Sequence, residues 1–325
     1  MRRALTGMAA GAALVVTGPV LAGCGGETDA NAESGKVTVV ASTNVYGDIV
    51  RRIGGDRVTV TSFISDPAQD PHSYQASTKN QLALSRAKVV VENGGGYDDF
   101  IDKMLSTANN GSATVINAVK VAHEPVPSGG ERGGTSRERP ASGGEHVWYD
   151  FTAMDRLAKK IASALGAADK TGSDTYTANA RAFGGDLAAL EKRTDEIKKK
   201  HTGEGVAITE PVPGYLLDAA GLRDRTPEEF SEAIEEGDDV PPRALKETLG
   251  LFSGPRKVRA LVYNAQTSGP QTKRVVRAAK DGGVPAVPVT ETLPSGKTYV
   301  GWMRANVGAL ATALSGDDAG EDGRS

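Results

Sequence analysis

The sequence predicts an α/β protein of two lobes, each with a central, mostly parallel sheet flanked by helices, and a single long helix joining them. Short β-branched and aliphatic runs alternate with amphipathic segments, an order typical of parallel sheets covered on both faces. One long stretch of unbroken helical periodicity interrupts this alternation, which then starts again. A chain of 325 residues also has room for about two domains.

The overall composition is that of an ordinary globular protein without a nucleic-acid partner. Hydrophobic residues make up 38% of the chain and charged residues 24%, and the formal net charge is −3. This charge provides no basic surface, which argues against nucleic-acid binding. The single cysteine, Cys24, excludes an intrachain disulfide and a metal site built on several cysteines.

The N-terminus predicts an exported lipoprotein. A positively charged start is followed by an apolar run at residues 8–20, about as long as the core of a secretory signal. Residues 21–24 (LAGC) have the small residues of a cleavage site, end on cysteine and resemble a bacterial lipobox. We therefore expect a signal peptide at 1–23, a lipid on Cys24 and a flexible tether at 24–35, with the protein anchored to the outer face of the cell membrane. The alternative is an ordinary signal peptide beside an incidental cysteine.

The first lobe is expected at residues 36–172. Its predicted strands are 36–41, 58–64, 88–92 and 113–117, and its predicted helices are 44–53, 78–85, 98–105 and 151–165. Residues 123–145 contain almost no apolar side chains and predict a long mobile loop. Asp150 is the expected N-cap of the helix that follows.

The linking segment is a long amphipathic helix from about Ser173 to Lys200, within a linker assigned to 173–201. Its apolar residues recur at three- and four-residue steps. Gly184 and Gly185 cost about 2 kcal/mol of helix propensity relative to two alanines. We therefore expect either close packing at the two glycines or a kink.

The second lobe is expected at residues 202–315, followed by a disordered tail at 316–325. Its predicted strands are 206–209, 258–263 and 284–290, and its predicted helices are 215–220, 242–251, 267–279 and 298–314.

Four metal-binding side chains follow strands or mark the end of the long loop: His72, His146, Glu210 and Glu291. His72 lies on a loop that Pro71 stiffens. Two of the four come from each lobe, so a cleft between the lobes could collect them.

Two neutral imidazoles and two carboxylates would balance the charge of a divalent cation. Nitrogen and oxygen ligands without sulfur suit Mn²⁺, Zn²⁺ or Fe²⁺; the carboxylates favour manganese modestly, and zinc accepts them too.

Several motifs resemble the solute-binding proteins of bacterial zinc and manganese ABC importers. They are DPHSY at 70–74, NGGGY at 93–97, HVWYD at 146–150, TEPVPGYL at 209–216, TETLP at 290–294 and YVGWM at 299–303. The resemblance runs from about residue 36 to residue 314. It implies two lobes joined by one helix, one divalent ion (Zn²⁺ or Mn²⁺) as transported ligand, and an ABC importer permease as partner.

The resemblance also bears on the choice of metal. The third ligand is His in typical zinc members and Glu in typical manganese members, and here it is Glu210. The fourth is usually Asp, so Glu291 extends that carboxylate by one methylene. Residues 124–145 lack the His-rich tract of many zinc members.

The predicted function is binding of a divalent transition metal outside the cytoplasm and its delivery to a membrane importer, by a monomer that is not an enzyme. Trp148 and Asp150 are candidates for supporting His146 without binding the ion. The alternatives are a metal-stabilised surface adhesin, a binder of chelated iron or haem, and a metallohydrolase, which would keep one metal position open for water.

Three further groups are not included in the candidate metal site. His123 belongs to the long loop, and His201 is interpreted as a helix-end residue. The acidic run 235–239 is interpreted as a solvated loop, with contact to a permease as the alternative.

Overall fold

The computed structural model describes residues 35–66, 69, 74–124, 144–267 and 269–316. The predicted signal peptide, Cys24, His72, most of the predicted loop and nearly all of the tail lie outside these ranges. Residues 36–325 belong to one compact unit. None of the helices in the described ranges combines the length and the apolar character needed to cross a membrane.

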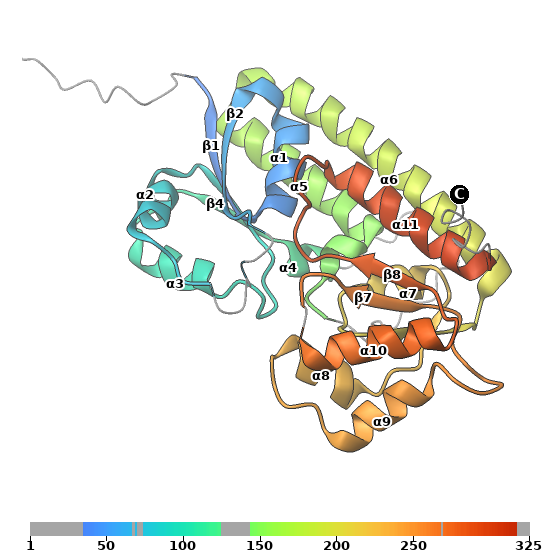
Figure 1. Ribbon diagram of the computed structural model, residues 1–325. Coiled ribbons are helices and arrows are strands. Elements are labelled where there is room, and N and C mark those ends of the chain that lie inside the picture. Colours follow the sequence, from blue (N-terminus) through green and yellow to red (C-terminus); the bar gives the residue numbers. More distant parts are fainter. Residues whose placement is uncertain (1–34, 67–68, 70–73, 125–143, 268, 317–325) are drawn as a thin grey trace, which may run out of the picture. The chain divides into compact units, whose positions relative to one another are not determined.

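The first sheet has four parallel strands in the order β2-β1-β3-β4 (Figure 1). Its strands are β1 (Val37–Thr43), β2 (Val58–Ile64), β3 (Val89–Glu92) and β4 (Thr114–Asn117). The helices that connect or follow them are α1 (Asn44–Gly54), α2 (Thr78–Arg86), α3 (Phe100–Thr107) and α4 (Ala118–Ala122). The two central strands, β1 and β3, are rich in valine because both faces of the parallel sheet are covered there.

The second sheet is also parallel and four-stranded, in the order β6-β5-β7-β8. Its strands are β5 (Gly205–Ile208), β6 (Arg223–Asp224), β7 (Leu261–Asn264) and β8 (Ala286–Val289). Its helices are α7 (Gly214–Ala219), α8 (Glu228–Glu235), α9 (Pro242–Gly250), α10 (Pro270–Asp281) and α11 (Tyr299–Ser315). The predicted fold class is thus confirmed, whereas β6 and α8 were not predicted.

One long helix, α6 (Ser173–His201), lies between the two sheets in the sequence and packs beside α5 (Phe151–Ala168) (Figure 1). Its buried stripe includes Phe183 and Leu187. These side chains join one hydrophobic core that also contains Val39 of β1 and Val262 of β7. The core therefore continues from one sheet to the other along α6.

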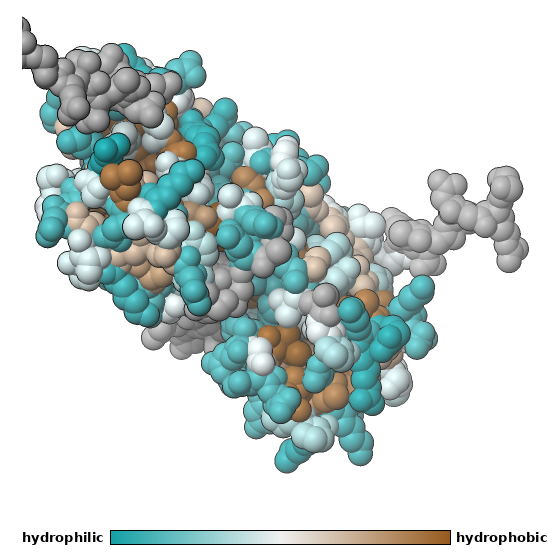
Figure 2. Space-filling view, turned by 60° about the vertical axis from the view of Figure 1, so that its left-hand side comes forward, coloured by the Kyte–Doolittle hydropathy of each residue, from teal (hydrophilic) through white to brown (hydrophobic). Residues whose placement is uncertain are grey.

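Hydrophilic residues dominate the face shown in Figure 2, where hydrophobic side chains reach the surface in separate patches. Within the described ranges, Leu82 and Val115 are the large hydrophobic residues that stand out as exposed.

The two glycines of α6 have different environments, and the helix continues through both. A Cβ at Gly184 would lie 2.6 Å from Asp155 Oδ1 of α5, whereas a Cβ at Gly185 would meet no atom within 4 Å. Close packing against α5 therefore accounts for Gly184 but not for Gly185.

We expect Gly185→Ala to raise the free energy of unfolding by about 0.4–1 kcal/mol, because alanine favours the helix and restricts the unfolded chain. Gly184→Ala is expected to gain less, because the Asp155 side chain must shift, and that side chain is held in an ion pair with Lys159 at 2.6 Å. Urea unfolding of both variants measures the difference. Equal gains would show that the approach of α5 does not require glycine at 184.

Candidate metal centre

Two of the predicted ligands meet at the carboxyl edge of the second sheet. Glu210 and Glu291 each lie two residues beyond the ends of β5 and β8, and Asn264 is the last residue of β7. The Asn264 amide Nδ2 donates to Glu210 Oε2 at 2.7 Å and to Glu291 Oε1 at 2.6 Å. The parallel strands thus deliver both carboxylates to one amide group at the carboxyl edge of the sheet, the edge where ligands bind in open α/β sheets.

The amide that joins the two glutamates is itself fixed. Asn264 is 1% exposed and Glu210 is 2% exposed. The Asn264 main-chain N–H donates to Thr209 Oγ1 at 3.0 Å, which ties β7 to the segment that leads into Glu210. Asn264 could not be selected from the sequence, because its role depends on two strands that are distant along the chain.

A second amide positions the loop that carries Glu291. The main-chain N–H groups of Glu291 and Thr292 both donate to Gln266 Oε1, at 2.7 and 3.1 Å. Gln266 Nε2 in turn donates to Thr292 Oγ1 at 2.7 Å. The backbone of this predicted ligand is therefore held by β7 and the residues that follow it.

His146 lies in an aromatic pocket. His146 is 1% exposed, and its ring packs edge-on against that of Trp148, with ring centroids 5.1 Å apart. Trp148 is also 1% exposed, and its carbonyl accepts a hydrogen bond from the Tyr299 hydroxyl at 2.7 Å. Trp148 thus both lines the imidazole and belongs to the core, two roles between which the sequence did not distinguish.

Tyr97 lies between His146 and Glu291. Its ring centroid is 6.0 Å from that of His146, and its hydroxyl donates to Glu291 Oε2 at 3.5 Å. Burial raises the pKa of Tyr97 well above its usual value, and the charge of Glu291 raises it further. The phenol therefore stays protonated at neutral pH.

The turn before Tyr97 is built from Gly94, Gly95 and Gly96, all with positive φ. The buried Asp98 carboxylate accepts hydrogen bonds from the main-chain N–H groups of Asn93 and Gly94, at 2.6 and 2.7 Å. This compact turn follows β3 and directs Tyr97 towards Glu291.

More hydrogen bonds connect the loop that carries Glu291 with residues from the first half of the chain. The Tyr149 hydroxyl donates to the Thr290 carbonyl at 2.9 Å. The Asn44 side chain donates to the Leu293 carbonyl and accepts from the Leu293 N–H, both at 2.9 Å. Hydrogen bonds from the first half of the chain therefore hold the backbone both before and after Glu291.

His146 also belongs to a second group of potential ligands. Among the described residues, Glu145, His146 and Glu235 are the only three His, Cys, Asp or Glu side chains whose ligand atoms all lie within 4.8 Å of one another. Glu235 Oε1 is 3.4 Å from His146 Nε2. Interpreting Glu235 as part of a solvated loop was therefore wrong, because it is the last residue of α8 and contacts a buried imidazole.

The structure also places the remaining candidates. Asp150 Oδ1 accepts from the Ala153 N–H at 3.0 Å, so the predicted N-cap is confirmed. His201 ends α6 and contacts Glu204 at 3.1 Å, which confirms a helix-end residue. His72 lies outside the described residues, and its part in the site stays a prediction.

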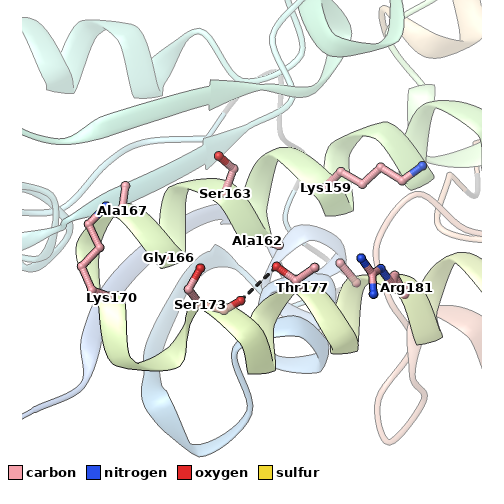
Figure 3. A pocket seen from close by; sticks show the side chains of 10 residues that line it. Lys159, Ala162, Ser163, Gly166, Ala167, Lys170, Ser173, Thr177 and Arg181 are labelled. Atoms are coloured by element: carbon pink, nitrogen blue, oxygen red, sulfur yellow. Dashed lines mark hydrogen bonds between the residues drawn. The ribbon is translucent and has the colours of Figure 1, made fainter.

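A cavity of about 600 Å³ lies along α5 and α6 (Figure 3), and it contains none of the predicted ligands. Of the hydroxyl groups in its lining, that of Thr177 donates to the Ser173 carbonyl at 2.9 Å. Lys159, also in the lining, is paired with Asp155. The candidate metal centre is therefore a different part of the molecule.

Glu92, at the end of β3, is a buried carboxyl group near the Gly94–Gly96 turn. It is 3% exposed and accepts a hydrogen bond from Asn117 Nδ2 at 2.8 Å. Burial raises its pKa from the ordinary 4.5 to about 7. The folded protein therefore holds this proton more tightly than the unfolded chain does, and its stability falls as the pH rises from about 4.5 through 7.

We expect Glu92→Gln to raise the free energy of unfolding at pH 8 by about 1–3 kcal/mol, with little effect near pH 4. Glutamine keeps an oxygen that can accept from Asn117 and carries no charge. Denaturant unfolding at the two pH values measures the effect, and Glu247→Gln, at an exposed surface pair with Arg243, serves as control. A gain independent of pH would contradict the raised pKa.

The donor set suits a divalent cation. The neutral Asn264 amide donates to both carboxylates, and the neutral Tyr97 phenol donates to Glu291. A buried carboxylate such as Glu210 beside the half-buried Glu291 costs free energy unless positive charge compensates the pair. A divalent ion bound by these two carboxylates would supply that charge with oxygen ligands that Mn²⁺, Fe²⁺ and Zn²⁺ accept. Among the described residues, the ligand atoms of His146, Glu210 and Glu291 do not all lie within 4.8 Å of one another, so the structure brings the two glutamates together but does not bring His146 into the same group.

Comparison with known proteins agrees with this chemistry. A family model described as zinc-uptake complex component A, periplasmic, matches residues 39–313. The manganese-binding lipoprotein MntA of Halalkalibacterium halodurans is 27% identical over 180 residues, which cover 55% of this chain and 56% of that protein, so this match spans little more than half of MntA. The metal ABC transporter substrate-binding lipoprotein ScbA of Streptococcus cristatus is 25% identical over 298 residues, covering 87% and 90%.

Solved structures share the fold. The solute-binding protein FpvC of Pseudomonas aeruginosa, in complex with Mn²⁺, superposes with a TM-score of 0.69 at 22% identity, covering 87% of this chain and 100% of that one. The periplasmic zinc-binding protein TroA of Treponema pallidum superposes with a TM-score of 0.67 at 20% identity, covering 86% and 99%. With two parallel sheets, one long helix and a family model that spans most of its length, the chain belongs to the zinc-uptake complex component A family of metal-binding solute-binding proteins.

Proposed function

We propose that this protein binds one divalent transition metal ion outside the cytoplasm and delivers it to the permease of an ABC importer. The proposed ligands are His72, His146, Glu210 and Glu291. The observation that carries the proposal is the Asn264 amide, which holds two carboxylates from different strands at one point. Membership of a solute-binding family supports a binding protein rather than an enzyme.

The carboxylates bear on the choice between manganese and zinc. Carboxylate oxygen suits Mn²⁺ well, and imidazole suits Zn²⁺, so two Glu and two His accept either ion. Relatives are named for manganese, iron and zinc. We propose Zn²⁺ or Mn²⁺ as the cargo, with the availability of each metal outside the cell contributing to the choice.

The location follows from the predicted N-terminus. We propose that the signal peptide at 1–23 is removed, that Cys24 carries a lipid, and that the monomeric protein remains on the outer face of the membrane beside its permease. Several relatives are named lipoproteins, which supports this proposal. Metabolic labelling with a fatty acid, lost in Cys24→Ser, is the expected result.

Metal content is the first test of the proposed function. Elemental analysis of purified protein lacking residues 1–24 is expected to find about one equivalent of divalent metal, and titration of Zn²⁺ against Mn²⁺ gives the preference. The double variant His72→Ala/His146→Ala is expected to lose this metal while keeping the circular dichroism of the folded protein. Absence of bound metal, together with no thermal shift with any divalent cation, would overturn the proposal.

Delivery to an importer is tested in cells. Deleting the gene is expected to lower metal uptake at limiting metal concentration, and the wild-type chain is expected to restore it. A chain with Glu210→Ala should be produced at the same level but fail to restore uptake. Uptake unchanged by the deletion would favour a surface adhesin.

A further inference from the structure

We propose that Glu235, the last residue of α8, is an additional ligand of the metal ion that His146 binds. The inference rests on the proposed function, because it concerns the same ion. It adds a carboxylate from a helix that the sequence did not predict, in an acidic run interpreted as solvated.

The distance between the two side chains fits shared coordination. Glu235 Oε1 lies 3.4 Å from His146 Nε2. A charge-assisted hydrogen bond between such atoms is shorter, about 2.7–2.9 Å. Two ligands that each lie about 2.0–2.2 Å from one ion are about 3.0–3.5 Å apart, depending on the coordination angle. The observed separation therefore matches two ligands of one ion better than a direct hydrogen bond.

The position of Glu235 on α8 directs its side chain inward. Ser231 lies one helical turn earlier on the same face and is 4% exposed, and the Glu235 side chain is 19% exposed. The neighbouring Glu232 and Glu236 are exposed. One carboxylate of this acidic segment thus faces the buried imidazole while the others face solvent.

The position of Glu235 in its helix is electrostatically unfavourable for a carboxylate. Glu235 occupies the last turn of α8, where the negative end of the helix dipole destabilises a carboxylate. Glu145 brings a second carboxylate into the same group of ligand atoms. A divalent ion shared with His146 would offset both unfavourable interactions.

A further carboxylate changes the chemistry of the site. Glu235 would add a carboxylate oxygen and a negative charge beside the imidazole nitrogen of His146. Manganese prefers such oxygen ligands and higher coordination numbers, whereas zinc in closed sites is almost always four-coordinate. Glu235 is therefore expected to favour Mn²⁺ over Zn²⁺.

Binding measurements on the purified protein test this role. The variants are Glu235→Gln, which keeps the size of the side chain, and Glu235→Ala, which removes every possible ligand atom. Glu236→Gln is the matched control, because it removes an adjacent but exposed carboxylate. Isothermal titration with Mn²⁺ and with Zn²⁺ gives the affinities, and the visible spectrum of the Co²⁺-loaded protein reports the ligands around the ion.

We expect both Glu235 variants to lower Mn²⁺ affinity at least about tenfold, to lower Zn²⁺ affinity by a smaller factor, and to change the Co²⁺ spectrum. Glu236→Gln is expected to leave both affinities and the spectrum unchanged. Affinities like those of Glu236→Gln would overturn the inference, as would lower affinity with an unchanged Co²⁺ spectrum. Wild-type protein that binds no metal would instead overturn the proposed function itself.

Discussion

Replacement of His146 by alanine is expected to lower the affinity for Zn²⁺ and Mn²⁺ at least about 100-fold. Loss of residues that only support metal ligands typically costs 10–100-fold, so loss of a ligand should cost at least as much. The imidazole is 1% exposed and is lined by the rings of Trp148 and Tyr97. Water that enters the vacated space cannot reproduce a nitrogen ligand held in this position.

Competition with a chromophoric chelator measures this loss for both metals. His201→Ala is the control, because His201 is the helix-end histidine of α6 that contacts Glu204. The control is expected to keep wild-type affinity. An unchanged affinity in His146→Ala, with the variant folded, would remove His146 from the site.

Replacement of Asn264 by leucine is expected to lower both the stability of the metal-free protein and the affinity for metal. Leucine has the same branched arrangement of side-chain heavy atoms but cannot donate to Glu210 and Glu291, which would be left without their shared donor. Loss of hydrogen bonds to buried charged groups costs about 1–3 kcal/mol or more. Metal affinity is expected to fall about 10–100-fold, because the two carboxylates lose their common orientation.

Thermal unfolding with and without metal, together with titration, separates the two effects. Asn110→Leu is a matched control, because the Asn110 amide donates to the Leu84 and Ala87 carbonyls, both at 2.8 Å, among residues outside the candidate site. It should lower the melting temperature and leave metal affinity unchanged. Equal affinity in Asn264→Leu and the wild-type protein would show that Asn264 does not organise the ligands.

The strands and long helices could be predicted because their signals are local. The β-branched residues at 58–64 predicted β2 with its observed bounds, and the apolar spacing along 173–200 predicted α6 to within one residue. Strand β6 consists of Arg223 and Asp224 alone and carries no hydrophobic signal. Helix α8 has only Phe230 and Ile234 as large buried residues within an acidic sequence, so its amphipathic pattern is short.

The candidate site was only partly predictable, because many of its contacts are not local in the sequence. Glu210 and Glu291 could be chosen because each closely follows a strand, and parallel strands end at one edge. Asn264 and Gln266 also lie at or just beyond the end of a strand, but amide and phenol side chains are not the usual ligands of these metals, so neither amide nor Tyr97 was chosen. Their contacts join segments that are distant in the sequence. The spacing of Glu235 from buried Ser231 on a helix was a usable signal, but only once α8 itself was recognised.

The hydrogen bonds of the 290–293 segment have a consequence for protein fragments. Thr290 is bound by Tyr149 and Leu293 by Asn44, so residues of the first half of the chain hold the backbone on both sides of Glu291. An isolated C-terminal half would contain Glu210, Asn264 and Glu291 in sequence, yet would lack these anchors. Even where β5, β7 and β8 still pair, the direction of Glu291 would depend on adding the other half.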